Sequence, residues 1–295
     1  MKALSLFALT LLFALPTEDV EYSPYYFLGQ KDGNISAVST QIKTAANASG
    51  FQLIGSYAPG NQKDLYVLVF TNTNTKSITS KAKKQGVVAA TYRVGLELKD
   101  SKVDITAVNP VYQWIAYLGE DYADVEKELS VESGKFNAFC KKIGNGKMTP
   151  FGGVEEEEDL IEYQYMFGMP YYEDQVELNE FASHAEGQKI IEGNLKNTES
   201  LKLVYKINDA KRDVTVYGVG LVDSKKGERH FLSIIGQKHV AAMPYELILD
   251  GKEAKMLHGR FRFALYWPEL TMGTFTQIMS TPGDCEVMLE KLTTE

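Results

Sequence analysis

Side chains that suit ligand binding gather in one stretch near the middle of this 295-residue chain. Residues 163–172 read Tyr-Gln-Tyr-Met-Phe-Gly-Met-Pro-Tyr-Tyr, so most of the stretch is aromatic or Met. Aromatic rings and thioethers form an adaptable apolar surface with polar tips, which suits an apolar or aromatic ligand. We therefore expect ligand contacts from this stretch and from an earlier aromatic segment, at Tyr112, Trp114, Tyr163, Tyr165, Met166, Met169 and Tyr171.

The same stretch has two other interpretations. Its aromatic residues approximate the period-two pattern of a half-buried strand that Gly168 and Pro170 end or bend, and such a strand would place the rings in a core. Met166 and Met169 carry the thioethers that Cu(I) prefers, but no His or Cys cluster lies nearby to complete a metal site. A core strand therefore remains the structural alternative to a ligand-binding surface.

Acid–base catalysis is the second class of function that the residues allow. Carboxylates and imidazoles follow the aromatic stretch, and we expect any catalytic acid or base among Glu173, Asp174, His184, His230 and His239. A structure that brings two of these side chains within hydrogen-bond reach in a cleft would favour an enzyme. The sequence holds no HExxH motif, no Cys/His cluster and no phosphate-binding glycine loop, so it predicts no metal and no cofactor.

An alternating Arg-Phe-Arg-Phe run occurs at residues 260–263. As a strand it would place Arg260 and Arg262 on one face and Phe261 and Phe263 on the other. The aromatic face would then be core. We expect the two arginines on a solvated face, where they would also suit a carboxylate ligand.

Composition is that of an ordinary globular protein, with 44% hydrophobic and 24% charged residues. The length exceeds the usual size of one domain, so two domains are expected. The formal net charge of −8 argues against nucleic acids and anionic membranes as partners held by long-range attraction.

The first residues have the plan of a secretory signal peptide. Lys2 is followed by an apolar run that ends near Ala14, and the run is too short to span a membrane comfortably. We expect residues 1–16 to be removed and the mature protein to be periplasmic or extracellular, without an integral membrane segment. Loss of Lys2 would change the net charge from −8 to −9. Export permits a disulfide between Cys140 and Cys285, but a single pair does not specify one.

The chain order is that of a mixed α and β protein. In the first half, apolar patterns predict strands at 22–30, 51–57, 65–70, 87–98 and 102–108, and helices at 35–46, 78–84, 114–117 and 122–143. In the second half they predict strands at 163–167, 201–207, 214–222, 231–235, 240–249 and 255–267, and helices at 178–195, 271–279 and 284–292. Turns at 99–101 and 250–252 close two hairpins.

A short internal sequence repeat links the two halves. Val88-Ala89-Ala90 aligns with Val240-Ala241-Ala242, and one residue is inserted at Met243-Pro244. Each stretch leads into a hairpin and then to a Pro. Two divergent copies of one α+β unit explain this order better than one large sheet. The expected domains are 20–144 and 160–295, joined by an acidic and glycine-rich linker at 145–159 that we expect to be solvated.

The first copy resembles the domain-of-unknown-function 302 family. The resemblance lies in a helix that ends at Gly50-Phe51, an apolar strand at 65–70 that ends at Thr71-Asn72-Thr73, and a small-residue strand start at Val88-Ala89-Ala90. The second copy, a degenerate one, keeps Pro244 but departs elsewhere. The resemblance implies two similar units, each a curved antiparallel sheet with helices on one face, similar to the TATA-box-binding-protein-like fold. It implies no catalytic residues, and the acidic charge argues against DNA binding.

These observations predict an exported, non-catalytic binding protein. An apolar or aromatic small molecule, or an envelope protein partner, would occupy the aromatic and Met segment between the two domains. The alternatives are an enzyme that uses carboxylate and His acid–base chemistry, and a structural envelope assembly protein. A homodimer through the exposed aromatic face is a further alternative.

Overall fold

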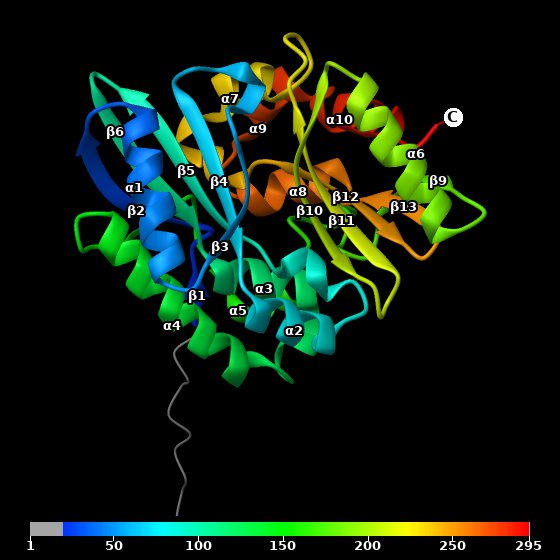
Figure 1. Ribbon diagram of the computed structural model, residues 1–295, viewed down its shortest axis with the longest axis horizontal. Helices are drawn as coiled ribbons and strands as arrows, with labels where there is room; N and C mark the ends of the chain where they lie inside the picture. Colours follow the sequence, from blue (N-terminus) through cyan, green and yellow to red (C-terminus); the bar gives the residue numbers. More distant parts are fainter. Residues whose placement is uncertain (1–19, 295) are drawn as a thin grey trace, which may run out of the picture.

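A computed structural model describes residues 20–294, so the predicted signal peptide lies outside the described residues. Two antiparallel sheets dominate these residues, and a short pair of strands accompanies them (Figure 1). The first sheet has the order β3-β4-β5-β6-β2-β7 and the second has the order β10-β11-β12-β13-β9. The strands of the first sheet are β2 (Tyr25–Asp32), β3 (Gln52–Tyr57), β4 (Leu65–Thr71), β5 (Tyr92–Lys99), β6 (Lys102–Val108) and β7 (Thr149–Phe151). Those of the second are β9 (Val176–Glu180), β10 (Leu201–Asp209), β11 (Val214–Leu221), β12 (Tyr245–Asp250) and β13 (Glu253–Met256), and the short pair is β1 (Glu21–Tyr22) and β8 (Glu155–Glu156).

Helices connect and cover the sheets. The α-helices are α1 (Ile35–Ala48), α2 (Thr73–Ala82), α3 (Pro110–Leu118), α4 (Glu126–Ile143), α5 (Glu157–Ile161), α6 (His184–Asn197), α7 (Glu228–Ile235), α8 (Gly259–Tyr266), α9 (Met272–Phe275) and α10 (Thr281–Glu290). The 3₁₀-helices are η1 (Pro59–Asn61), η2 (Gly86–Ala89), η3 (Gly119–Tyr122), η4 (Gln237–Ala242) and η5 (Thr276–Ile278). In residues 20–294, no helix is both long and apolar enough to cross a membrane. The fold class predicted from the sequence, α+β, is confirmed.

The order of elements repeats along the chain. From β9 to α8 the chain forms a strand, a helix, two strands, a helix, a 3₁₀-helix, two strands and a helix. It forms the same series from β2 to α3, with one additional 3₁₀-helix, η1, between β3 and β4. Matching strands also have the same order in the two sheets. Strand pairing shifts at the same place in both copies, between Leu53 and Gly55 on β3 and between Leu203 and Tyr205 on β10. We call residues 25–118 the first unit and residues 176–266 the second unit.

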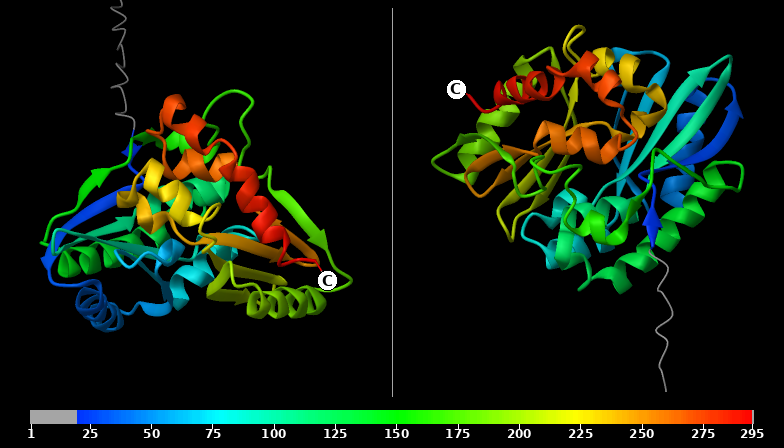
Figure 2. Two further views of the ribbon diagram at one scale, coloured as in Figure 1. Left: turned by 90° about the horizontal axis from the view of Figure 1, so that it is seen from above. Right: turned by 180° about the vertical axis from the view of Figure 1, so that it is seen from behind.

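The outer face of each sheet packs on the long helix that follows its first strand, α1 in the first unit and α6 in the second. The opposite faces turn toward the other unit (Figure 2). On β5, for example, the Tyr92 ring stacks on Phe136 of α4, at 4.7 Å between ring centroids. Gly95 points the other way, because successive residues of a strand alternate between faces, and a Cβ there would lie 2.7 Å from the backbone of Ala241 in η4. Gly95 thus permits a close approach between the units.

Four buried side chains at matching positions join the two units. Arg93 and Glu246 are the second residues of β5 and β12, and Gln113 and Arg262 are the fourth residues of α3 and α8. Arg93 donates to Gln113 over 2.9 Å within the first unit, and Arg262 donates to Glu246 over 3.0 Å within the second. An ion pair of 2.9 Å between Arg93 and Glu246 crosses the interface. One carboxylate therefore neutralises part of the charge of two buried guanidinium groups.

The helices α3 and α8 meet through another matched pair. Tyr117 and Tyr266 are the eighth residues of these helices, and their hydroxyl oxygens lie 3.1 Å apart. Contact between equivalent residues is the signature of an approximate two-fold axis. Together with the repeated order of elements, this contact supports an approximate two-fold relation between the units.

A buried carboxylate forms a second link between the units. Glu228 of α7 accepts hydrogen bonds from the Tyr57 hydroxyl at 2.6 Å and from the Gly60 backbone N–H at 2.9 Å. The backbone N–H of Leu221 is its third donor, at 3.0 Å. Burial raises the pKa of Glu228, although these three hydrogen bonds act in the opposite direction.

The segment predicted as a solvated linker, 145–159, has mostly exposed residues, but it also forms short elements that pair with the rest of the chain. β7 adds to the edge of the first sheet beside β2, β8 pairs with β1, and α5 begins at Glu157. Buried apolar residues of both units form one core. Both cysteines are buried free thiols, and burial raises the pKa of Cys285 to about 12.

Three predicted strands are wrong. Residues 163–167 form no strand, residues 231–235 belong to helix α7, and the second strand of the last hairpin ends at Met256, before α8 begins. In α8 the two arginines point to different sides, because residues two apart on a helix are about 200° apart around its axis. Arg262 is buried in the central network and Arg260 is exposed.

Candidate ligand-binding groove

Residues 163–172 form a loop between α5 and β9 that we call the aromatic–Met loop. Its ends are anchored: Tyr163 and Tyr172 are buried, and their rings pack edge to face against Phe261 of α8, with centroids 5.9 and 6.0 Å away. The middle is turned outward, and Phe167 is fully exposed. A hydrogen bond of 2.9 Å from the Met169 N–H to the Met166 carbonyl closes a turn there. The loop therefore presents apolar side chains to solvent from a fixed base.

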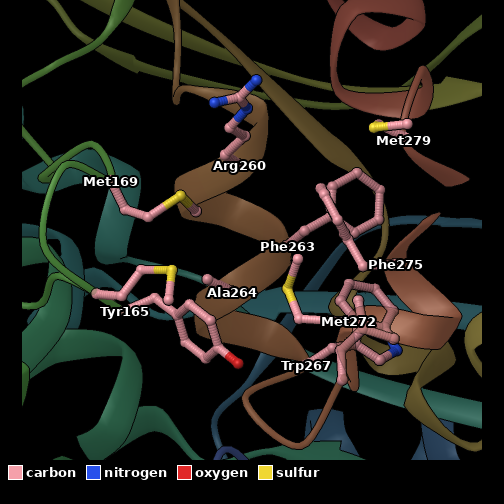
Figure 3. Close-up of a pocket in the computed structure, with 11 residues that line it drawn as sticks. Tyr165, Met169, Arg260, Phe263, Ala264, Trp267, Met272, Phe275 and Met279 are labelled. Carbon is pink, nitrogen blue, oxygen red and sulfur yellow. The ribbon is translucent and has the colours of Figure 1, made fainter.

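A groove of about 250 Å³ lies between this loop, α8 and the segment that contains α9 and η5 (Figure 3). We call it the Met groove, because four thioethers line it. Its lining residues are Tyr165, Met166 and Met169 from the loop, Arg260, Phe263, Ala264 and Trp267 from α8 and its C-terminal end, and Leu270, Met272, Phe275 and Met279 from the last segment. Arg260 is the single charged residue among them.

The floor of the Met groove is one face of α8. Arg260, Phe263, Ala264 and Trp267 have the spacing i, i+3, i+4 and i+7, which places their side chains along one side of a helix. Phe263 and Trp267 are each 1% exposed, so the floor is fixed by the core beneath it. Met272 and Met279 are 62% and 65% exposed at the rim. A rigid aromatic floor thus lies under a flexible rim.

The matching face of α3 in the first unit is packed against other helices. The residues of α3 that match the groove floor are Val111, Trp114, Ile115 and Leu118. Here η3, α4 and α5 pack on α3, and Trp114, Ile115 and Leu118 are buried. After α3 the chain forms the 18-residue helix α4, whereas after α8 it forms the shorter α9, η5 and α10. On the matching face of α8, Phe263 and Trp267 are buried as well, but Arg260 is exposed and Ala264 is partly exposed, so this part of the helix borders the groove.

Comparison with known proteins finds no matching family model, no matching curated protein and no matching solved structure. The resemblance to the domain-of-unknown-function 302 family and to the TATA-box-binding-protein-like fold stays a prediction.

Three of the seven predicted ligand-binding residues line the groove, namely Tyr165, Met166 and Met169. Tyr112 and Trp114 do not, because they are buried in α3. The Tyr112 hydroxyl donates to the Leu265 carbonyl at 2.8 Å, and the Trp114 indole N–H donates to the Ala89 carbonyl at 3.0 Å.

Tyr163 and Tyr171 also lie outside the groove lining. Tyr163 is one of the buried anchors of the loop. Tyr171 is exposed and lines a separate polar pocket beside Lys83 and Glu173. Sequence reasoning missed the α8 face and the last segment, although the i, i+3, i+4, i+7 pattern was present from Arg260 to Trp267.

The five residues predicted for acid–base catalysis do not come together. Among residues 20–294 no hydrogen bond or ion pair joins any two of them. Glu173 pairs with Lys83 at 2.8 Å, and Asp174 accepts from the Tyr171 backbone N–H at 2.9 Å. The rest are His184, whose ring bonds Gly251 and Thr215, His230 in α7, and His239 in η4.

His239 is buried beside an acidic residue, and its titration is testable. Its Nε2 lies 3.4 Å from Glu269. Burial, with a smaller contribution from Lys238, lowers the pKa of His239 to about 4. We expect NMR titration of the His239 ring to show no protonation until the pH nears this value. The unfolded chain takes up this proton near the ordinary value of 6.5, so the free energy of unfolding should lose the His239 contribution as pH falls from 6.5 to about 4. A midpoint near 6.5 in the folded protein would contradict this burial.

Proposed function

We propose that this protein is a non-catalytic binding protein that holds an apolar ligand in the Met groove. The observation that carries the proposal is an apolar groove beside α8, where Ala264 is partly exposed above buried aromatic rings and four methionines belong to the lining. Thioether side chains are flexible and polarizable, so they adapt to the shape of an apolar ligand. An apolar cavity of about 150 Å³ is enough to hold benzene, so the volume of the Met groove admits a larger molecule.

The exposed apolar side chains around the groove support the same proposal. Phe167, Met166, Met272 and Met279 are all more than half exposed. Exposing such groups costs free energy that burial against a ligand recovers, at about 25 cal/mol for each Å² of apolar surface removed from water. Contiguous apolar surface on a monomer commonly marks a binding site.

We further propose that the protein acts outside the cytoplasm, in the periplasm or the extracellular space. The support is the signal-peptide pattern of residues 1–16. The acidic net charge is consistent with a ligand other than a nucleic acid. Mass spectrometry of the protein purified from its own cells would test export directly, because a processed N-terminus is expected and an intact one would contradict it.

A neutral fluorescent probe tests ligand binding in the groove. N-phenyl-1-naphthylamine is apolar and becomes fluorescent in a dry site. We expect saturable binding to the wild-type protein, and we expect the double variant Met272→Asp/Met279→Asp to bind roughly tenfold more weakly or worse, because two charged groups then border the apolar rim. Both positions are exposed, so the fold should tolerate the changes.

Val131→Asp is the matched control. Val131 is 59% exposed on α4, close to the exposure of the two methionines, but it lies in the covering helix of the first unit. This variant should bind the probe as the wild type does. Equal loss in both variants, or no saturable binding to the wild type, would contradict the proposal.

A further inference from the structure

One charged side chain lies at the edge of an otherwise apolar groove. Arg260 is the second residue of α8, and Figure 3 shows its guanidinium at the rim, directed away from Phe263 and Ala264. Its backbone N–H donates to His258, the N-cap residue of α8. Among residues 20–294, no hydrogen bond or ion pair is formed by the guanidinium of Arg260. It is therefore a cation without a partner beside an apolar surface.

The match between the two units shows that this cation is particular to the groove. The residue of α3 at the position of Arg260 is Val111, which is partly buried and packs on the core. In the covered first unit, an apolar residue thus occupies the place that holds the charge in the open second unit. The rest of the groove floor is apolar in both units. Arg260 itself is exposed, so its guanidinium is not part of the packed core.

We propose that the ligand is an anionic amphiphile, with an apolar chain in the Met groove and a carboxylate or similar head group on Arg260. This inference depends on the proposed function and specifies its ligand class. An arginine binds a carboxylate through two parallel hydrogen bonds, so the head group would be held in a defined orientation. The chain would lie over Phe263, Ala264 and Trp267, beside the thioethers of the loop and the rim.

Charge complementarity favours this ligand over a neutral one. A cationic head group at the same end would meet the guanidinium and be repelled. A neutral chain would leave Arg260 unpaired, although it would still bury the apolar floor. Free fatty acids and single-chain lipids with anionic head groups share the required chemistry.

Displacement of the neutral probe by two chains of equal length tests the inference. Decanoate and decanol differ only in the head group, so their ratio of affinities isolates the charge. We expect decanoate to displace N-phenyl-1-naphthylamine from the wild type at a concentration roughly fivefold to tenfold lower than decanol requires. In Arg260→Gln this preference should disappear, so that decanoate and decanol displace the probe at similar concentrations. Arg260→Lys should keep most of the preference, because it keeps the charge.

Arg229→Gln is the control for a general change of net charge, since Arg229 is also an exposed helical arginine but lies on α7. It should leave the preference unchanged. Equal displacement by decanoate and decanol in the wild type would overturn the inference while leaving the proposed function intact. Loss of the preference in Arg229→Gln would also overturn it. Failure of the probe to bind at all would instead overturn the proposed function.

Discussion

Replacing Glu246 with Gln is expected to lower the free energy of unfolding by about 3–5 kcal/mol. The side chains of Glu246, Arg93 and Arg262 are each at most 1% exposed. Removal of the one carboxylate leaves two guanidinium groups buried without an opposite charge. Carbonyl groups would still accept from both arginines, at Ala242 and Pro244, but they carry no full charge. Chemical denaturation followed by circular dichroism would measure the loss.

A surface pair provides the matched control for this variant. Glu180 forms an ion pair with Lys252, and the two side chains are 50% and 57% exposed. The same chemical change at this site, Glu180→Gln, should leave the free energy of unfolding almost unchanged, because water already screens the pair. If both variants lose similar stability, the central network does not hold the units together in the way proposed here. Replacing Arg93 with Met in the Glu246→Gln background should recover part of the loss, since one uncompensated charge is then removed.

A bulky side chain placed on the groove floor is expected to weaken ligand binding strongly. Ala264 is partly exposed at the centre of the α8 face. A tryptophan at this position would occupy much of a groove of about 250 Å³, so Ala264→Trp should weaken binding of N-phenyl-1-naphthylamine by roughly tenfold or more. The fold should survive, because the matching residue of the first unit is the larger Ile115. Fluorescence titration measures the affinity, and thermal unfolding checks the fold.

A bulky substitution elsewhere separates this effect from a general one. Ala37 is exposed on α1, far along the chain from the groove and in the first unit. Ala37→Trp should keep the affinity of the wild type. Unchanged binding in a folded Ala264→Trp variant would place the probe at another site.

Part of the fold could be predicted because its signals are local. The match between Val88-Ala89-Ala90 and Val240-Ala241-Ala242 identified equivalent positions of the two units, and the inserted residue at Met243-Pro244 precedes β12. The strand starts predicted at 87 and 240 are wrong, because these residues belong to the 3₁₀-helices η2 and η4, and the strands begin at Tyr92 and Tyr245. The repeat was visible because both copies pack these residues against the other unit, where little space is available. The hairpin turns at 99–101 and 250–252 were also predicted correctly.

Short apolar runs were assigned wrongly because four or five residues fit both the two-residue period of a strand and the 3.6-residue period of a helix. Residues 231–235 read Phe-Leu-Ser-Ile-Ile, a short run that suits either a buried strand or a helix. Tertiary packing makes them part of helix α7. The run from Arg260 to Phe263 alternates, yet its continuation to Trp267 follows the helical spacing. The longer window contained the decisive signal.

The candidate site was half predicted for a related reason. Tyr165, Met166 and Met169 were identified from composition alone. Tyr112 and Trp114 were misplaced because α3 is buried on nearly every side, so its aromatic residues serve the core. The residues of α8 and the last segment meet the loop only through the tertiary fold. No spacing in the sequence connects residue 166 with residue 279.

Methionine methyl groups give the most direct test of the groove. The chain has nine methionines, of which Met166, Met169, Met272 and Met279 line the groove, whereas Met243, Met256 and Met288 are buried in the core. In protein labelled with ¹³C at the methionine methyl groups, addition of decanoate is expected to shift the four groove resonances and leave those of the three core residues in place. Shifts confined to other methionines, or no saturable shift at the four groove residues, would contradict the claim that this groove binds an apolar ligand.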